Sequence, residues 1–212
     1  MLIGLLLLST LTGCAHIYCE YKHHYPAIYT LKPLTILIII FAVLALGPNN
    51  NYQQIIIAGL VFSMAGDCFL MLRQQQFIAG LLSFLVAHIL YCVAFYQQLT
   101  TLLTTPLPWH TLPWLCIPAL AFYAYLWSGL DKLKAPVLIY ISAIVMMAFL
   151  SLAVYLETSS NYALAAFIGA LIFMVSDASL ALNKFKLPFV AAQAVILSTY
   201  YLAQWGIAYS AL

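Results

Sequence analysis

Charged side chains are scarce in this sequence. Only 6% of the 212 residues are Asp, Glu, Lys or Arg, whereas 66% are hydrophobic. A soluble globular chain carries about 25% charged residues, and a fold of this length has too little interior to hide so much apolar surface from water. The scarcity of charge and the lack of a basic patch exclude a soluble domain and a nucleic-acid partner, and they predict that lipid is the main solvent.

The sequence also lacks the cysteine and histidine spacings of cross-linked folds. Its five cysteines are an odd number without paired spacing, which is not a disulfide framework. The residues richest in potential metal ligands fit no standard zinc pattern; they are Cys14, His16, Cys19, His23 and His24. We therefore expect neither a disulfide framework nor a metal or other cofactor.

Apolar runs fill nearly the whole chain, and short polar or Pro-containing breaks separate them. A helical span needs about 20 apolar residues. The pattern predicts an all-α polytopic membrane bundle of eight transmembrane helices, forming a single integral membrane domain over residues 1–212. The expected spans are 2–18, 31–47, 53–72, 77–97, 111–130, 135–156, 161–183 and 187–210.

All seven basic residues fall at the odd-numbered loops between these spans. They are Lys22, Lys32, Arg73, Lys132, Lys134, Lys184 and Lys186. Because basic residues gather on the cytoplasmic side, we expect a multi-pass protein of a bacterial inner membrane with both termini outside the cytoplasm. A wrong number of spans would have scattered these charges over both sides.

The first span has a competing interpretation. Residues Leu11 to Cys14 resemble a lipoprotein cleavage box, and the apolar run before them is short. However, a signal peptide normally begins with Lys or Arg, which residues 1–4 lack. We favour a first helix that is retained.

An internal echo links the third and seventh spans. Residues 59–67 (GLVFSMAGD) resemble residues 169–177 (GALIFMVSD) at an offset of 110, and each segment ends in aspartate. Since these two spans run in the same direction, the echo predicts two parallel four-helix halves.

Asp67 and Asp177 are the only acidic residues well inside spans. A carboxylate at bilayer depth costs about 2.5–3.5 kcal/mol and marks a functional site by default. At 1.5 Å per residue, both lie about 9–11 Å from the cytoplasmic ends of their helices. One such aspartate could simply bridge helices, but two at a matched depth favour catalysis.

Further polar residues within spans are the candidates for binding a substrate. They are Lys32, Ser63, His88, Tyr91, Tyr140, Ser176, Tyr200 and Gln204. The serines could orient the carboxyl groups, and Lys32 could pair with an aspartate or hold a phosphate. The helical rise places His88 several ångströms deeper than the carboxyl groups, which disfavours a metal site made of these three residues. Each residue taken alone is more often a packing or helix-bridging group.

Several short motifs occur in a recognisable order. They are Lys32-Pro33-Leu34, Gly66-Asp67, His88-x-x-Tyr91, Pro136-Val137-x-x-Tyr140, Ser176-Asp177-x-x-Leu180-Ala181 and Ser198-Thr199-Tyr200-Tyr201-x-Ala203-Gln204. Together they cover nearly the whole chain, and the sequence resembles the YhhN-like lysoplasmalogenase family of eight-span membrane proteins. The resemblance implies cleavage of the vinyl ether bond of lysoplasmalogens, which releases a fatty aldehyde and glycerophosphoethanolamine or glycerophosphocholine.

The carboxyl pair suits that chemistry. One acid protonates the β-carbon of the vinyl ether, and one base activates the water that attacks the resulting cation, as two carboxyl groups do in glycoside hydrolysis. We expect Asp67 and Asp177 to form this pair, with no assignment of acid and base. The partners expected are a lysophospholipid substrate and membrane lipids.

Two other classes of function remain open on the sequence. Parallel halves with a polar site inside the membrane are also typical of transporters, so a small lipid transporter or flippase is one alternative. A hydrolase of another single-chain lipid is the other enzymatic candidate. A structural or regulatory scaffold is a further alternative, and it predicts that both aspartates are dispensable.

Overall fold

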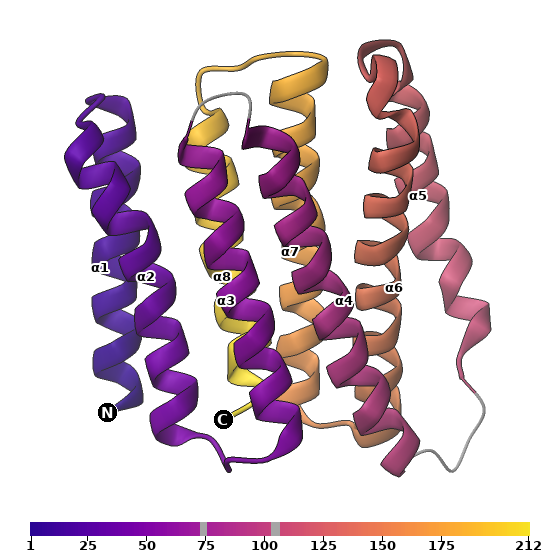
Figure 1. Ribbon diagram of the computed structural model, residues 1–212. Helices are drawn as coiled ribbons and strands as arrows, with labels where there is room; N and C mark the ends of the chain where they lie inside the picture. Colours follow the sequence, from indigo (N-terminus) through magenta and orange to yellow (C-terminus); the bar gives the residue numbers. More distant parts are fainter. Residues whose placement is uncertain (73–75, 103–106) are drawn as a thin grey trace.

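A computed structural model describes residues 1–72, 76–102 and 107–212 (Figure 1). It confirms the predicted all-α bundle, because the described residues form eight α-helices and no strand. The helices are α1 (Leu2–Tyr21), α2 (Tyr25–Leu46), α3 (Asn51–Met71), α4 (Phe77–Leu102), α5 (Leu112–Leu126), α6 (Lys134–Thr158), α7 (Asn161–Phe185) and α8 (Ala192–Tyr209). Short 3₁₀ turns flank α5 at η2 (Trp109–Thr111), η3 (Trp127–Gly129) and η4 (Asp131–Leu133).

Seven helical segments, which contain α1 to α7, are long and apolar enough to cross a membrane in the described part of the chain. Helix α8 is less apolar because it carries Gln193, Gln204 and several hydroxyl side chains. It nevertheless packs along α7 within the bundle (Figure 1). The protein is therefore a polytopic helical bundle, and eight crossings remain a prediction.

Two helix boundaries differ clearly from the expected spans. Helix α2 begins at Tyr25, because the ring of His24 accepts a hydrogen bond from the Ala27 backbone and Pro26 suits the first turn. Lys32 consequently lies about two turns inside α2, which corrects its placement at the start of a span. The last helix begins at Ala192 instead of residue 187, because Pro188 and its neighbours form a loop.

Small residues allow the central helices to approach closely. The backbones of Gly169 in α7 and Gly206 in α8 meet, and a Cβ atom on Gly206 would lie 2.8 Å from the Gly169 Cα. Close approach at small residues is the usual way in which helices pack within a membrane. Helices α3 and α4 form a second closely packed pair, while α5 lies at one edge of the bundle and α1 at the other (Figure 1).

Several helix contacts of the first four helices recur among the last four. In the first half α1 packs on α2 and α3 on α4, and in the second half α5 packs on α6 and α7 on α8. Across the halves, α2 contacts α8 and α6 contacts α4. If α1 to α4 correspond to α5 to α8, then α2 corresponds to α6 and α8 to α4. The contact between α2 and α8 therefore corresponds to the contact between α6 and α4. The contacts thus support the relation predicted from the sequence echo.

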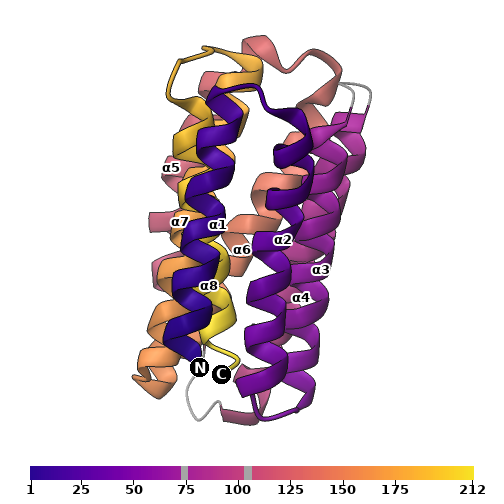
Figure 2. The same cartoon turned by 90° about the vertical axis from the view of Figure 1, so that its left-hand side faces the viewer.

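Both termini lie at one end of the bundle, and the loops that follow α1, α5 and α7 lie at the other (Figures 1 and 2). These three loops and their helix ends carry Lys22, Lys132, Lys134, Lys184 and Lys186. We call this the basic end. The predicted loop residue Arg73 lies outside the described residues. The segregation of the described lysines at one end agrees with the alternating charge pattern of the sequence.

Candidate active site

A cavity of about 320 Å³ opens near the basic end between α1, α2, α3, α4, α7 and α8. Both predicted carboxyl residues, Asp67 and Asp177, line its wall. We call this cavity the polar chamber, because charged and polar side chains gather on it: Glu20, Lys32, Asp67, Ser176, Asp177, Asn183, Lys184, Gln193 and the tyrosines 25, 29 and 200. The fold therefore brings together two aspartates that are 110 positions apart in the sequence.

Asp67 has a cation as its partner. The Nζ of Lys32 lies 3.1 Å from Asp67 Oδ1, and both side chains are buried. The other carboxylate oxygen, Oδ2, has no hydrogen-bond partner among the described residues. The hydroxyl of Tyr200 from α8 interacts electrostatically with Asp67, but it makes no hydrogen bond with the described residues. Lys32 thus pairs with an aspartate, which is one of the two roles that the sequence allowed.

Asp177 has a tyrosine and a histidine as its partners instead. The hydroxyl of Tyr140 from α6 donates a hydrogen bond of 2.6 Å to Asp177 Oδ2. The His88 Nε2 from α4 lies 3.7 Å from the same oxygen. Since both contacts converge on Oδ2, the second oxygen of Asp177 is the one available to a bound molecule.

His88 corrects an expectation from the sequence. The helical rise placed it several ångströms deeper than the carboxyl groups, yet its ring reaches Asp177. Side chains lean toward the N-terminus of their own helix, and α4 starts at the basic end whereas α7 starts at the opposite end. The side chains of His88 and Asp177 therefore lean toward each other. The His88 ring is held edge-on by Tyr140 and Phe173, with ring centroids 5.1 and 4.8 Å away.

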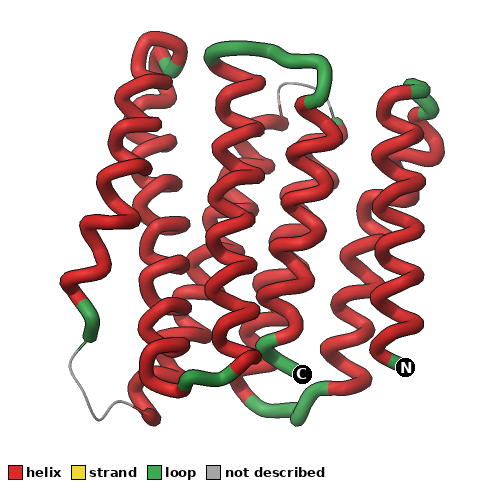
Figure 3. The backbone as a smooth tube through the Cα atoms, turned by 180° about the vertical axis from the view of Figure 1, so that it is seen from behind, coloured by secondary structure: helices red, strands yellow, loops and turns green. Residues whose placement is uncertain are grey.

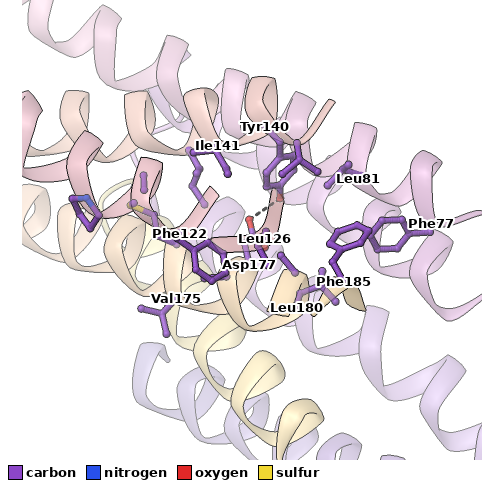
Figure 4. A pocket seen from close by; sticks show the side chains of 17 residues that line it. Phe77, Leu81, Phe122, Leu126, Tyr140, Ile141, Val175, Asp177, Leu180 and Phe185 are labelled. Atoms are coloured by element: carbon purple, nitrogen blue, oxygen red, sulfur yellow. Dashed lines mark hydrogen bonds between the residues drawn. The ribbon is translucent and has the colours of Figure 1, made fainter. Parts of the chain in front are cut away.

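A second cavity of about 320 Å³ lies between α4, α5, α6 and α7 (Figure 4). Its lining is apolar except for two side chains, Tyr140 and Asp177, which point toward each other and share the hydrogen bond described above. We call this cavity the apolar chamber. Representative lining residues are Leu81, Phe122, Leu126, Ile141, Ile144 and Met174.

The two chambers meet at three shared residues. Phe77, Asp177 and Leu180 line both of them. Asp177 therefore stands where an apolar space passes into a polar one, while Asp67 lines only the polar chamber. An amphipathic molecule with one apolar chain and one charged end matches this arrangement.

Four of the predicted substrate-binding residues line neither chamber; His88, which contacts Asp177, is one, and the other three form a separate cluster. Tyr91 donates a hydrogen bond of 2.9 Å to Gln204, and its ring packs against Gly59, so that it joins α4 to α8 and α3. Ser63 is buried beside this pair and interacts with Tyr91. These residues bridge helices in the core and do not line the cavities.

The remaining predicted residues divide between two roles. Ser176 lines the polar chamber, but its hydroxyl donates to the Ile196 backbone carbonyl at 3.0 Å and so joins α7 to α8. It does not orient Asp177 through a hydrogen bond in the described contacts. Tyr200 lines the same chamber, and its ring packs edge-on against Phe84 and Phe173.

The sequence analysis missed Glu20 as a site residue. Glu20 lies in the last turn of α1 and lines the polar chamber. His16 lies one turn earlier, with its Nε2 3.4 Å from Glu20 and its Nδ1 2.8 Å from the hydroxyl of Tyr201. The spacing of His16 and Glu20 at i and i+4 could have indicated this contact. Its position beside a cavity formed by distant helices could not be read from the sequence.

Metal-ligating side chains do not gather at this site. Within the described ranges, no three His, Cys, Asp or Glu side chains are arranged to hold a metal ion. The side chains in contact with the two aspartates are those of Lys32, Tyr140 and His88.

The fold and the site define a multi-pass helical membrane protein with two carboxyl groups on a polar chamber, one of them at the junction with an apolar chamber. The chain belongs to the YhhN family, whose pattern it matches over residues 27–211. That match includes both aspartates and every helix from α2 to α8.

Several named proteins are similar to this chain. Lysoplasmalogenase TMEM86A of Homo sapiens is 38% identical over 162 residues, which are 74% of this chain and 65% of that protein. Lysoplasmalogenase TMEM86B of Homo sapiens is 31% identical over 86% of this chain and 74% of that protein. The uncharacterized membrane protein YhhN of Escherichia coli O157:H7 is 26% identical over 82% and 81%. The match thus spans slightly less than two thirds of TMEM86A, and no solved structure matches the chain.

Proposed function

We propose that this protein is a membrane-embedded hydrolase that cleaves the vinyl ether bond of lysoplasmalogens, with Asp67 and Asp177 as its acid–base pair. The products are a fatty aldehyde and glycerophosphoethanolamine or glycerophosphocholine. The observation that carries the proposal is a pair of carboxyl groups on one cavity: Asp67 is buried, and the partly buried Asp177 lies at the junction with an apolar chamber. The similarity to proteins named lysoplasmalogenases supports the choice of substrate.

The two chambers suggest which carboxyl group acts as the acid. In a vinyl ether the β-carbon belongs to the aliphatic chain, and the α-carbon bears the oxygen that leads to the glycerol and headgroup. A chain in the apolar chamber and a headgroup in the polar chamber place the β-carbon beside Asp177 at the junction. The α-carbon then faces the polar chamber, which Asp67 lines. Asp177 is therefore assigned as the acid and Asp67 as the base.

The reaction consumes one water molecule. Asp177 gives its proton to the β-carbon, and the electrons of the double bond form the new C–H bond. The ether oxygen stabilises the cation that this leaves at the α-carbon. Asp67 takes a proton from water as the water oxygen attacks the α-carbon, which forms a hemiacetal. The bond between the α-carbon and the ether oxygen then breaks. The hemiacetal hydroxyl returns a proton to Asp177 to give the aldehyde, and Asp67 gives its proton to the glycerol oxygen as it leaves.

The neighbours of each carboxyl group suit these roles. The ammonium group of Lys32 balances the charge of an ionised Asp67 at 3.1 Å and leaves Oδ2 for the water. Tyr140 holds Asp177 through Oδ2, which leaves Oδ1 to carry the proton to the substrate. Two carboxyl groups with such different surroundings are the usual basis for separate acid and base roles.

The headgroup has a matching set of side chains in the polar chamber. Since Lys32 is paired with Asp67, Lys184 of α7 is the cation best placed for the phosphate. Glu20 of α1 lines the same chamber and suits the ammonium group of ethanolamine or choline. Helix α8 lies between α1 and α7 and contacts both, so that the two charges are on different sides of the chamber. The lysines of the basic end support its placement on the cytoplasmic side of a bacterial inner membrane.

Aldehyde release tests the proposal directly. Purified, detergent-solubilised protein is given a lysoplasmalogen, with Asp67→Asn protein of matched folding as the control. Release by the wild type and none by the variant is the expected result. No aldehyde from folded wild-type protein would exclude the proposal. Product formation from a different single-chain lipid, or accumulation of intact lipid in sealed vesicles, would then identify the alternative.

A further inference from the structure

The apolar chamber is not closed on all sides. Val175 of α7 and Pro118 of α5 both line it, yet 53% of Val175 is exposed and Pro118 is also exposed. The chamber therefore reaches the outer surface of the bundle between α5 and α7. In a membrane, the surface of these two apolar helices faces lipid chains.

The ends of α5 and α7 are joined toward the basic end, through η3 and the residues at the end of α7. There, the carbonyl of Phe185 lies so close to Gly129 that no side chain could fit at that glycine. The Nζ of Lys186 also donates a hydrogen bond of 2.6 Å to the hydroxyl of Ser128. Farther from the basic end, α5 diverges from the bundle (Figures 1 and 3). The opening at Val175 and Pro118 thus lies farther from the basic end than this contact. The contact closes the gap between α5 and α7 at the basic end.

We propose that the opening between α5 and α7 admits one aliphatic chain from the bilayer into the apolar chamber, which is the binding site for that chain. The occupant is the single chain of a lysolipid, because the chamber is lined by apolar side chains and joins the polar chamber at Asp177. This route allows the charged headgroup to stay near the basic end while the chain moves sideways. The orientation of the lipid rests on the proposed function, whereas the occupancy of the chamber can be tested without turnover.

Photo-crosslinking with a non-reactive lipid tests the site. The probe is a lysophospholipid with a saturated alkyl ether chain that carries a diazirine, so that there is no vinyl ether bond to cleave. After illumination of the protein in detergent, mass spectrometry locates the labelled residues. We expect labels on the chamber-facing residues of α5, α6 and α7, such as Phe122, Ile141 and Met174, and their loss when excess unlabelled lysolipid is added.

A matched pair of variants tests the opening. Val175→Trp places a large ring in the gap, whereas Ile168→Trp adds the same ring two turns away on the same face of α7. Ile168 is 46% exposed and lines neither chamber. Labelling should fall about tenfold in Val175→Trp, as exclusion of chain atoms from an apolar pocket predicts, and should stay near the wild-type level in Ile168→Trp. Both variants must elute at the same volume as the wild type in size-exclusion chromatography, which shows that they are folded.

The outcomes separate this inference from the proposed function. Equal labelling in the two variants, or labels confined to the outer surface near residues such as Ile139, would overturn the chain site. Labelling inside the chamber without aldehyde release from lysoplasmalogen would uphold the chain site and reject the reaction. Aldehyde release without labelling in the chamber would uphold the reaction and reject the chain site.

Discussion

The surroundings of Asp67 and Asp177 differ although the two residues end the similar segments 59–67 of α3 and 169–177 of α7. Asp67 on α3 is approached from α2 by Lys32 and from α8 by Tyr200. Asp177 on α7 is approached from α6 by Tyr140 and from α4 by His88. Each carboxyl group thus receives one neighbour from its own half and one from the other half. The helices correspond, whereas the side chains they present do not.

This difference shows how two similar helix segments can supply two unlike carboxyl groups. Helices α3 and α7 place both aspartates on one cavity, and the change from an ammonium group to a phenol beside them gives each a separate chemical character. Burial makes such a neighbour decisive, because an unpaired charge inside a protein is costly. Substitutions at the aspartates and at their partners therefore probe the comparison most directly.

The largest effect is expected from the aspartates themselves. Asp67→Asn and Asp177→Asn should each lower kcat for aldehyde release by about 10²- to 10⁴-fold, the usual worth of a general acid or base. Asp131→Asn is the matched control, because Asp131 precedes α6 outside both chambers and asparagine tolerates its left-handed backbone. Activity near the wild-type level in either site variant would remove that residue from the mechanism.

Removal of the Lys32 ammonium group should lower stability if Asp67 is ionised. Lys32→Met leaves a buried carboxylate without its partner, and breaking a buried ion pair typically costs about 3–5 kcal/mol. A thermal unfolding measurement in detergent should show a marked loss of stability. The double variant Lys32→Met with Asp67→Asn should recover much of that loss, because no charge is then left unpaired. A double variant as unstable as Lys32→Met would argue that Lys32 acts mainly through packing.

A smaller effect on catalysis is expected from Tyr140. Tyr140→Phe removes the hydrogen bond to Asp177 Oδ2 and keeps the ring that contacts His88. Loss of one such bond to a carboxyl group should lower kcat about tenfold with KM nearly unchanged. Tyr123→Phe is the control, since Tyr123 is also a buried tyrosine that donates a hydrogen bond but lies outside both chambers. Equal losses in the two variants would point to a general effect on folding.

Substitution of the proposed phosphate-binding residue should change KM. Lys184→Met should raise KM for a zwitterionic lysoplasmalogen about tenfold while kcat changes little, because a bound phosphate loses its charged hydrogen-bond donor. Lys132→Met, at the same end but away from the polar chamber, serves as the control. Steady-state kinetics at fixed ionic strength distinguish the two variants. An unchanged KM in Lys184→Met would move the phosphate to another residue.

The smallest effect is expected where a polar cluster lies outside the chambers. Tyr91→Phe removes the hydrogen bond to Gln204 and should lower stability by about 0.6–1.7 kcal/mol, as interhelical hydrogen bonds in membranes do. Aldehyde release at saturating substrate should remain within about twofold of wild type. A large loss of turnover with normal stability would bring Tyr91 back into the site.

Much of this architecture is readable from the sequence. The apolar runs predict the membrane bundle, the distribution of lysines predicts which loops share one end, and the echo around Asp67 and Asp177 predicts the relation between α3 and α7. These features depend on composition and on local periodicity, which a single chain displays directly. The boundaries of α2 and α8 were less accurate, because a histidine cap and a proline loop act within a few residues.

The division of polar residues between the chambers and the core was decided only by tertiary structure. Tyr91 and Tyr140 both lie inside apolar helices in the sequence, yet one bridges helices and the other holds a site carboxyl group. His88 reaches Asp177 because the two helices run in opposite directions and their side chains lean toward each other. Glu20 meets the polar chamber because α1 ends beside it. The sequence by itself determined a helical membrane protein with two buried carboxyl groups, since the cost of placing charge in lipid is local. The chambers on either side of Asp177 depend on how distant helices pack, which no local pattern records.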